Sequence, residues 1–247
     1  MPKPIIFEAL ICGFDGTIFD TQKYHAKVES MILKEYGLEI DPLFITRKYS
    51  GVSTRKMFQD FIPELKNGSL DELVRRKFDL LGEVVDSLDV EELFLPHAKD
   101  TIIKIYERGY KLAIATASTR VYVEKILERS SVGYCFRKKR EDDSRPEPYN
   151  FVVTGEDVDF GKPAPDIYLH TADLLDVDPK DCAVVEDGIS GMVAGTDAGM
   201  YVFGLSEREP SAFDYEVTRN SHLLVRSWKV VDIFFQGKSK ISTLSDI

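Results

Sequence analysis

Short apolar segments alternate with amphipathic segments through the second half of the chain, and this alternation constrains the fold more than any other feature. The apolar runs at 112–116 and 182–186 have the length and composition of buried strands, and the segments between such runs show the period of helices. Strands that alternate with helices form right-handed units on a parallel sheet covered on both faces. The sequence therefore predicts an α/β fold with strands at 5–12, 110–116, 150–154, 182–186, 200–204 and from 222, and helices at 98–108, 120–129, 165–175, 190–198 and up to 236.

The segment from residue 20 to about 92 lacks this alternation and is predicted to be helical throughout. Apolar residues recur at helical spacing over 21–36, and Gly37 stands where a helix commonly ends. Asp41 followed by Pro42 is typical of a helix start. Residues 69–72 form a capping-box pattern ahead of a further helical stretch.

The helical segment is expected to be an insertion, because one predicted strand precedes it and all the others follow it. We predict an α/β core domain made of residues 1–17 and 94–247 and an all-helical cap domain of residues 18–93. Linkers near 18 and 94 are expected to act as a hinge between the two.

Composition and charge exclude several classes of function. The chain carries 42 acidic and 32 basic residues and a net charge of -10, which disfavours binding a nucleic acid over a broad surface. No apolar run approaches the roughly 18 residues that span a membrane, and the first residues lack the layout of a signal peptide. The three cysteines form no CxxC pair, so free thiols and a cytoplasmic location are expected.

The segment 137–148 is densely charged and almost free of apolar residues, so it cannot build a core. We predict an exposed loop there. Its basic residues leave open a second interpretation, in which the loop docks a protein partner.

Polar residues gather where the predicted strands end, which is where open parallel sheets bind ligands. Asp15 follows the first strand, residues 116–118 end the second, and residues 186–187 end the strand that begins at 182. Lys162 lies in a proline-rich loop just before a helix. Each group alone has a structural explanation, such as acids at a helix start. Together they supply the carboxylates, hydroxyls, amides and ammonium that suit phosphoryl chemistry with a hard cation.

Four segments form a recognisable series: FDGTIFDT at 14–21 followed by His25, LAIATAS at 112–118, GKPAPD at 161–166, and VVEDGISG at 184–191 followed by AGM at 198–200. This series spans nearly the whole chain. It resembles the haloacid dehalogenase (HAD) superfamily, and within it the β-phosphoglucomutase-like and phosphoglycolate-phosphatase-like group. The resemblance implies a Rossmann-like core with an inserted helical cap, a small phosphorylated metabolite as substrate, a Mg²⁺ ion, and an aspartyl-phosphate intermediate.

The resemblance also implies a role for each matching residue. Asp15 is expected to act as acid and base, with Thr116 and Lys162 also at the catalytic centre. The remaining expectations are phosphate binding by Thr116, Ala117, Ser118 and Lys162, a metal held by Asp15, Asp187 and Glu186, and substrate contacts from His25 and from Arg55 in the cap loop 50–56.

The sequence departs from the family at one decisive position, because Gly13 stands where the family has its nucleophilic aspartate. Glycine can neither attack phosphorus nor hold a metal, so the covalent step has no obvious agent. We predict a phosphatase- or phosphomutase-type site with impaired or absent turnover, and as the alternative a non-catalytic regulatory protein. Three origins remain open: a natural pseudo-enzyme, a variant of an active enzyme, or a water activated by Asp15. Gly13→Asp is expected to restore Mg²⁺-dependent phosphatase activity.

Overall fold

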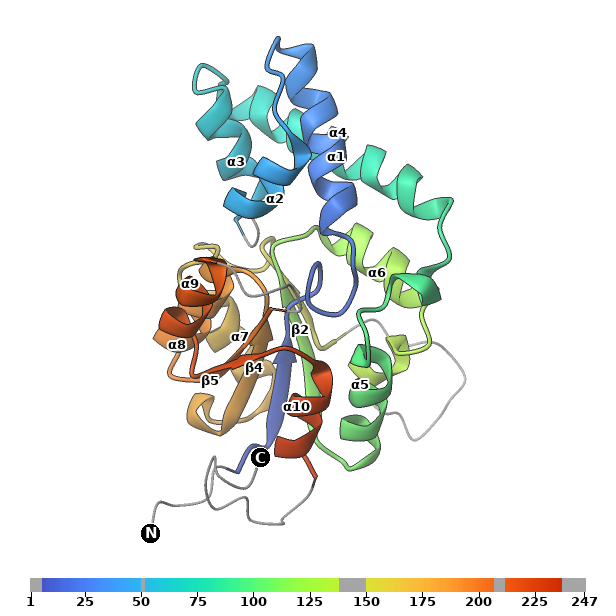
Figure 1. Cartoon of the computed structure of the whole chain (residues 1–247), viewed down its shortest axis with the longest axis vertical. Helices are drawn as coiled ribbons and strands as arrows, with labels where there is room; N and C mark the ends of the chain where they lie inside the picture. Colours follow the sequence, from blue (N-terminus) through green and yellow to red (C-terminus); the bar gives the residue numbers. More distant parts are fainter. Residues whose placement is uncertain (1–5, 50–51, 138–149, 207–211, 237–247) are drawn as a thin grey trace.

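The computed structural model describes residues 6–49, 52–137, 150–206 and 212–236, and it confirms the predicted fold class (Figure 1). The strands form a six-stranded sheet in the order β3-β2-β1-β4-β5-β6, and every neighbouring pair is parallel. β1 therefore lies near the middle, between β2 and β4. The strands are β1 (Ala9–Cys12), β2 (Lys111–Thr116), β3 (Val152–Thr154), β4 (Cys182–Glu186), β5 (Tyr201–Leu205) and β6 (Leu223–Val225).

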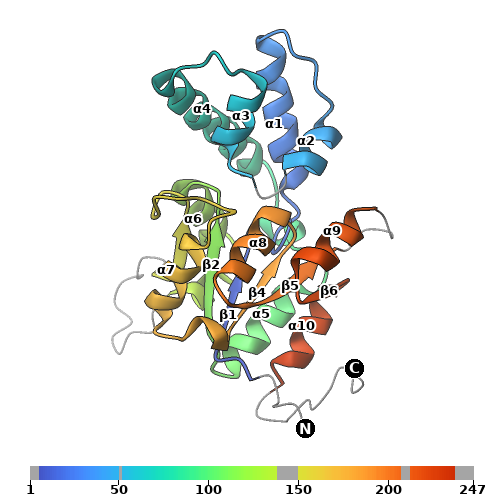
Figure 2. The same ribbon diagram turned by 90° about the vertical axis from the view of Figure 1, so that its left-hand side faces the viewer.

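Helices cover both faces of the sheet because successive strand residues point to opposite faces (Figure 2). In β1, Leu10 and Cys12 belong to the hydrophobic cluster that includes residues of α5, α6 and α10, whereas Ala9 and Ile11 belong to the cluster that includes residues of α7, α8 and α9. The helices are α5 (Ala98–Glu107), α6 (Arg120–Glu128), α7 (Asp166–Leu175), α8 (Ile189–Asp197), α9 (Ala212–Asn220) and α10 (Trp228–Phe234).

Four helices between β1 and α5 form a layer beyond the carboxyl ends of the strands (Figures 1 and 2). The last of these helices, Asn67–Asp86, contacts the core at its carboxyl end. Arg129, just after α6, donates to the carbonyls of Val85 (3.0 Å) and Leu88 (2.6 Å) there. We call this layer the cap. Its helices are α1 (Gln22–Glu35), α2 (Pro42–Tyr49), α3 (Thr54–Phe61) and α4 (Asn67–Asp86), followed by a short 3-10 turn at Val90–Leu93.

The structure corrects three sequence-based expectations. β1 begins at Ala9, not at residue 5, because its pairing with both neighbouring strands starts there. α4 begins at Asn67, since the amide of Leu70 already donates to the carbonyl of Lys66 (2.9 Å) and the capping-box pattern falls inside the first turn. The sequence analysis also missed α9, in which Val217 is the fully buried apolar residue among those with described side chains.

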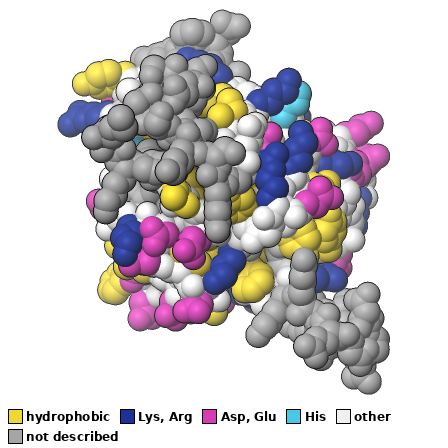
Figure 3. All heavy atoms as spheres, turned by 90° about the horizontal axis from the view of Figure 1, so that it is seen from below, with side chains coloured by type: hydrophobic (Ala, Val, Ile, Leu, Met, Phe, Trp, Pro, Cys, Tyr) yellow, Lys and Arg dark blue, Asp and Glu magenta, His cyan; other side chains and the backbone are white. Residues whose placement is uncertain are grey.

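The structure bears on three further expectations, which concern a membrane span, the surface charge and the loop 137–148. None of the described helices is both long and apolar enough to cross a membrane. On the described part of the face opposite the cap, basic and acidic side chains are interspersed (Figure 3). The predicted loop 137–148 lies outside the described residues except for Arg137, so its exposure and its role in docking a partner stay predictions.

Candidate functional site

The sheet brings the predicted strand-end residues together at its cap-facing edge. Gly13 and Asp15 follow β1, Ser118 follows β2 and Asp187 follows β4, and these three strands are neighbours at the centre of the sheet. A pocket between cap and core is lined on the core side by Phe14, Asp15, Thr116, Ala117, Ser118, Lys162, Glu186 and Asp187. The predicted catalytic, phosphate-binding and metal residues therefore share one pocket, which is a matter of position and not yet of role.

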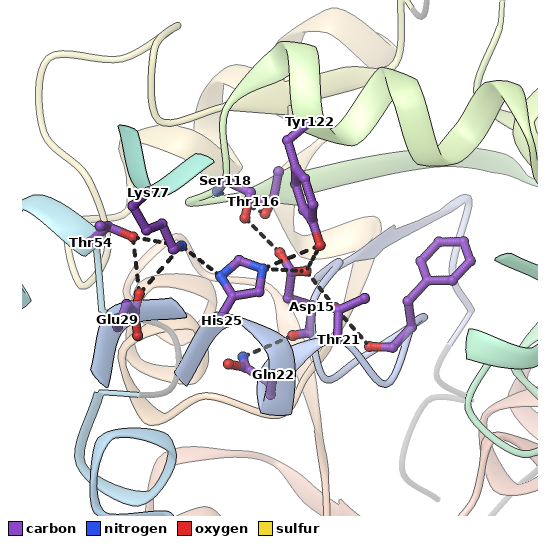
Figure 4. Close-up of polar contacts among 11 residues, drawn as sticks. Asp15, Thr21, Gln22, His25, Glu29, Thr54, Lys77, Thr116, Ser118 and Tyr122 are labelled. Atoms are coloured by element: carbon purple, nitrogen blue, oxygen red, sulfur yellow. Dashed lines mark hydrogen bonds and ion pairs between the residues drawn. The ribbon is translucent and has the colours of Figure 1, made fainter. Parts of the chain in front are cut away.

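The carboxylate of Asp15 is fully engaged in hydrogen bonds (Figure 4). Its Oδ1 accepts from Thr21 (2.5 Å) and Tyr122 (3.1 Å) and lies 2.9 Å from His25 Nε2, while Oδ2 accepts from Ser118 (2.6 Å). Burial by itself would raise the pKa of Asp15, but the attraction of His25 and these hydrogen bonds outweigh burial and hold the pKa below its usual range. Asp15 is thus an anion with both oxygens occupied.

A buried lysine of the cap extends this network. Lys77 of α4 is 0% exposed, and its Nζ lies 2.7 Å from His25 Nδ1 and 3.3 Å from Glu29 Oε1 and donates to Thr54 (3.0 Å) (Figure 4). Burial lowers the pKa of Lys77 against the opposing effects of Glu29 and Asp15. Through His25, three cap helices are therefore linked to the turn that carries Asp15.

Sequence reasoning named His25 and placed Thr54 in the cap loop 50–56, but it missed Lys77, Glu29 and Tyr122. A signal for Lys77 was available, because the residue stands on the apolar face of α4 between Leu73 and Leu81, where a solvated lysine does not belong. Tyr122 carried no comparable signal, since a buried tyrosine on an amphipathic helix is ordinary core.

The place that a side chain at residue 13 would occupy is already crowded. An added Cβ would lie 2.6 Å from Thr17 Oγ1, 3.0 Å from Glu186 Cδ and 3.1 Å from Glu186 Oε1. The Thr17 hydroxyl donates to Asp187 (2.9 Å), so it is held in place. A Cβ at Gly191 would also lie 2.4 Å from the Glu186 carboxylate. The two glycines therefore make room for the Glu186 side chain.

Glu186 and Lys162 form a buried ion pair beside Gly13. Lys162 Nζ also donates to the carbonyl of Ala115 (3.0 Å), and Tyr168 donates to Glu186 Oε1 (2.7 Å). The thiol of Cys12, next to Gly13 in the chain, is 0% exposed, and burial raises its pKa, so the thiolate does not form readily. Cys12 is therefore a poor candidate for a nucleophile beside Gly13.

The remaining predicted residues differ in where they lie. Thr116 Oγ1 accepts from the amide of Ser118 (3.1 Å), which folds the strand end into a turn at the pocket. Arg55 does not line the pocket, because it is half exposed and forms an ion pair with Asp71 of α4. Of the predicted cap loop 50–56, Val52 and Thr54 line the pocket, whereas Ser50 and Gly51 lie outside the described residues.

The donor set suits Mg²⁺ in kind, but several of its members already have partners in the protein. Asp187 and Glu186 offer carboxylate oxygens and Asp15 a backbone carbonyl, which a hard cation prefers. That carbonyl, however, accepts from Gln22 (3.2 Å), and Glu186 is paired with Lys162. In the part of the chain that the structure describes, no three His, Cys, Asp or Glu side chains lie close enough together to hold an ion.

Comparison of the sequence with known proteins identifies the family of this chain. The sequence model of one protein family, the haloacid dehalogenase-like hydrolases, matches residues 10–205 of this chain. Fructose-1-phosphate phosphatase YqaB of Escherichia coli is 30% identical over 196 residues, which cover 78% of this chain and 94% of that protein. Beta-phosphoglucomutase of Bacillus subtilis is 27% identical over 209 residues, which cover 82% of this chain and 85% of that protein.

A solved structure agrees on the fold. Beta-phosphoglucomutase from Clostridium difficile superposes with a TM-score of 0.72 at 19% identity, and the match covers 93% of this chain and 97% of that one. This likeness concerns the fold, whereas the family match rests on sequence over most of the chain. The chain belongs to the haloacid dehalogenase-like hydrolases.

Proposed function

We propose that the chain binds the phosphoryl group of a small phosphorylated metabolite between cap and core, and that it hydrolyses or transfers this group slowly or not at all. The observation that carries the proposal is the absence of a side chain at Gly13, in a pocket that otherwise keeps the family's strand-end groups. The relatives named above act on sugar phosphates according to their names. This supports phosphate esters as the ligand class.

Phosphoryl binding is supported by the groups that line the pocket floor. Lys162 supplies a cation, Thr116 supplies a hydroxyl, and the turn after β2 adds backbone amides. The Ser118 hydroxyl becomes available only if it leaves Asp15. A phosphoryl group needs donors of these kinds around its oxygens. Because Lys162 is paired with Glu186, a bound phosphate would share the ammonium with that carboxylate.

Impaired turnover follows from the groups around Gly13. Thr17 is bonded to Asp187, and Ser118 donates to a carboxylate whose pKa is lowered and which is therefore a weak base. Activation of water by Asp15 would require one of its oxygens to leave a hydrogen bond. Binding and electrostatics without a nucleophile leave roughly 10³- to 10⁴-fold acceleration over water in hydrolase triads, so a slow residual hydrolysis is compatible with the proposal.

Mg²⁺ belongs to the proposal as a weakly held ion. Asp187 and the carbonyl of Asp15 would bind it, with Glu186 available only if its pair with Lys162 opens. The ion would neutralise charge on the phosphoryl oxygens.

Substrate entry in this proposal depends on the hinge. The cap of residues 18–93 would move on a core of 1–17 and 94–247, with linkers near 18 and 94. Closure would exclude water and bring His25 and its cap partners to Asp15.

The test combines binding with turnover. Phosphate affinity is measured by calorimetry for the parent, for Lys162→Met and Thr116→Val, and for Lys180→Met as a control on an exposed lysine that does not line the pocket. We expect the first two variants to weaken binding at least tenfold and the control to leave it unchanged. Two variants are used because Lys162→Met leaves Glu186 without its ion-pair partner.

Turnover is assayed on sugar phosphates, phosphoglycolate and nucleotide monophosphates, with and without Mg²⁺. We expect little or no release of phosphate. A parent protein that turns over at ordinary enzyme rates, on the order of 1 to 10³ per second, would contradict the impaired site. Phosphate affinity that survives both site variants would contradict the location.

A further inference from the structure

The cap side of the pocket is apolar, in contrast to its floor. Six apolar residues from all four cap helices or the segments between them line it: Ala26, Ile45, Tyr49, Val52, Met57 and Phe78. All of them are buried except Val52, which is partly exposed. Whatever part of a ligand extends from the floor toward the cap therefore meets hydrocarbon and the aromatic rings of Tyr49 and Phe78.

Several polar groups on the same wall already have partners within the protein. Thr46 donates to the carbonyl of Pro42 (3.1 Å). Thr54 accepts from Lys77, and Glu29 pairs with the same lysine. A ligand rich in hydroxyl groups would thus lose water on this wall and gain few hydrogen bonds in return.

Among its described residues, the wall offers no lysine or arginine for a second negative charge. Lys77 spends its three hydrogen-bond donors on His25, Thr54 and Glu29, and Arg55 pairs with Asp71 away from the pocket. Among the described residues that line the pocket, Lys162 is the only lysine or arginine, and it belongs to the floor. Glu29 adds a carboxylate on the cap side, which disfavours a second anionic group nearby.

We propose that the pocket selects a phosphate monoester whose alcohol is apolar, aromatic or branched aliphatic, and carries no second charge, in preference to sugar phosphates and bisphosphates. This inference rests on the proposed function, because it takes the phosphoryl group to lie on the floor at Lys162. Burial of apolar surface against the wall favours such an alcohol. The unpaired polar groups of a sugar, and the second phosphate of a bisphosphate, oppose binding.

The experiment compares four probes on the full chain by calorimetry: inorganic phosphate, phenyl phosphate, glucose 6-phosphate and fructose 1,6-bisphosphate. We expect phenyl phosphate to bind at least tenfold more tightly than the two sugar esters. Inorganic phosphate, which reaches only the floor, serves as the reference for the proposed function.

Variants then locate the preference. Met57→Gln replaces an apolar wall residue by a polar one of similar size, and Ile45→Thr makes a second polar change on a different helix. We expect each to weaken phenyl phosphate binding several-fold and to leave inorganic phosphate unchanged. Met31→Gln is the matched control, since Met31 is 62% exposed and does not line the pocket. Thermal unfolding verifies that each variant is folded.

The outcomes separate the two proposals. If inorganic phosphate and all three esters fail to bind, the proposed function is wrong and this inference falls with it. If phosphate binds but glucose 6-phosphate or the bisphosphate binds as tightly as phenyl phosphate, only the apolar selectivity is overturned. The apolar selectivity is also overturned if Met31→Gln weakens phenyl phosphate binding as much as the wall variants do.

Discussion

The floor and the cap wall of the pocket hold their charged groups in different ways. On the floor, Lys162 and Glu186 pair with each other and both line the cavity. On the cap side, Lys77 is withdrawn behind the wall, where it binds His25 and Glu29. The cation on the floor can therefore meet a ligand, whereas the cation in the cap holds helices together and fixes His25. The same kinds of residue serve recognition in one region and packing in the other.

Restoring a carboxylate on the floor tests whether Gly13 alone limits turnover, and it should give the largest effect. Covalent and metal contributions are each worth several kcal/mol, and about 1.36 kcal/mol corresponds to a tenfold change in rate. The structure revises the expectation that Gly13→Asp suffices, because the new Cβ would meet Thr17 Oγ1 at 2.6 Å. We expect Gly13→Asp with Thr17→Ala to raise Mg²⁺-dependent phosphatase activity at least 100-fold over the parent.

Comparison of the variants decides what limits the single change. Gly13→Asp alone should gain less than the pair, and Thr17→Ala alone should gain nothing. Equal activity of the single and double variants would show that the Thr17 side chain moves aside for the new aspartate without a loss of activity. A double variant that folds, binds phosphate and remains inactive would mean that more than the nucleophile has been lost.

Removing Lys77 from its buried partners His25 and Glu29 should lower the free energy of unfolding more than a change at an exposed ion pair does. Lys77→Met leaves Glu29 as a buried carboxylate without its cation, and breaking a buried pair in this way costs about 3–5 kcal/mol. Urea denaturation should show this loss in the free energy of unfolding. Lys125→Met is the control, because Lys125 joins α6 to Asp86 at an exposed position and such pairs contribute about 0–1 kcal/mol.

The pairing itself is tested by a second change. Glu29→Gln in the Lys77→Met background removes the stranded charge, so part of the lost stability should return. No recovery would show that Lys77 stabilises the cap through His25 and Thr54 instead.

The difference between floor and wall also explains how far the sequence could predict the site. The floor residues follow strands, and a parallel sheet brings its strand ends to one edge whatever the side chains are. Asp15, Lys162 and Asp187 could therefore be placed together before the structure was known. The pocket contains all three.

The wall could not be predicted in this way, because it depends on how four helices rotate against one another. Helical periodicity identifies a buried face but not which of its residues meets a cavity and which meets a neighbouring helix. Arg55 was chosen for its charge and its loop, yet Asp71 on a neighbouring helix binds it. Met57, two residues further along α3, lines the pocket instead.

A smaller effect is expected when a methyl group alone is added on the floor. Gly13→Ala forces Thr17 and Glu186 to move, and overpacking of this kind typically costs about 1–3 kcal/mol. Gly68→Ala is the matched control, since Gly68 lies in α4 with no heavy atom within 4 Å of an added Cβ, and this change should stabilise by roughly 0.5–1 kcal/mol. Similar effects of both changes on the midpoint of urea unfolding would contradict the crowding at Gly13.

The smallest effect is expected at Arg55, and it separates a substrate contact from a surface ion pair. Arg55 and Asp71 have side chains that are 44% and 59% exposed, and exposed pairs contribute about 0–1 kcal/mol to stability. Arg55→Ala should therefore change the free energy of unfolding by less than about 1 kcal/mol and leave the affinity for phosphate and phenyl phosphate within twofold of the parent. Calorimetry on Arg55→Ala and Asp71→Ala provides the comparison. A tenfold loss of ester affinity in Arg55→Ala alone would mean that Arg55 leaves Asp71 when a ligand binds, and the cap wall would then supply a cation after all.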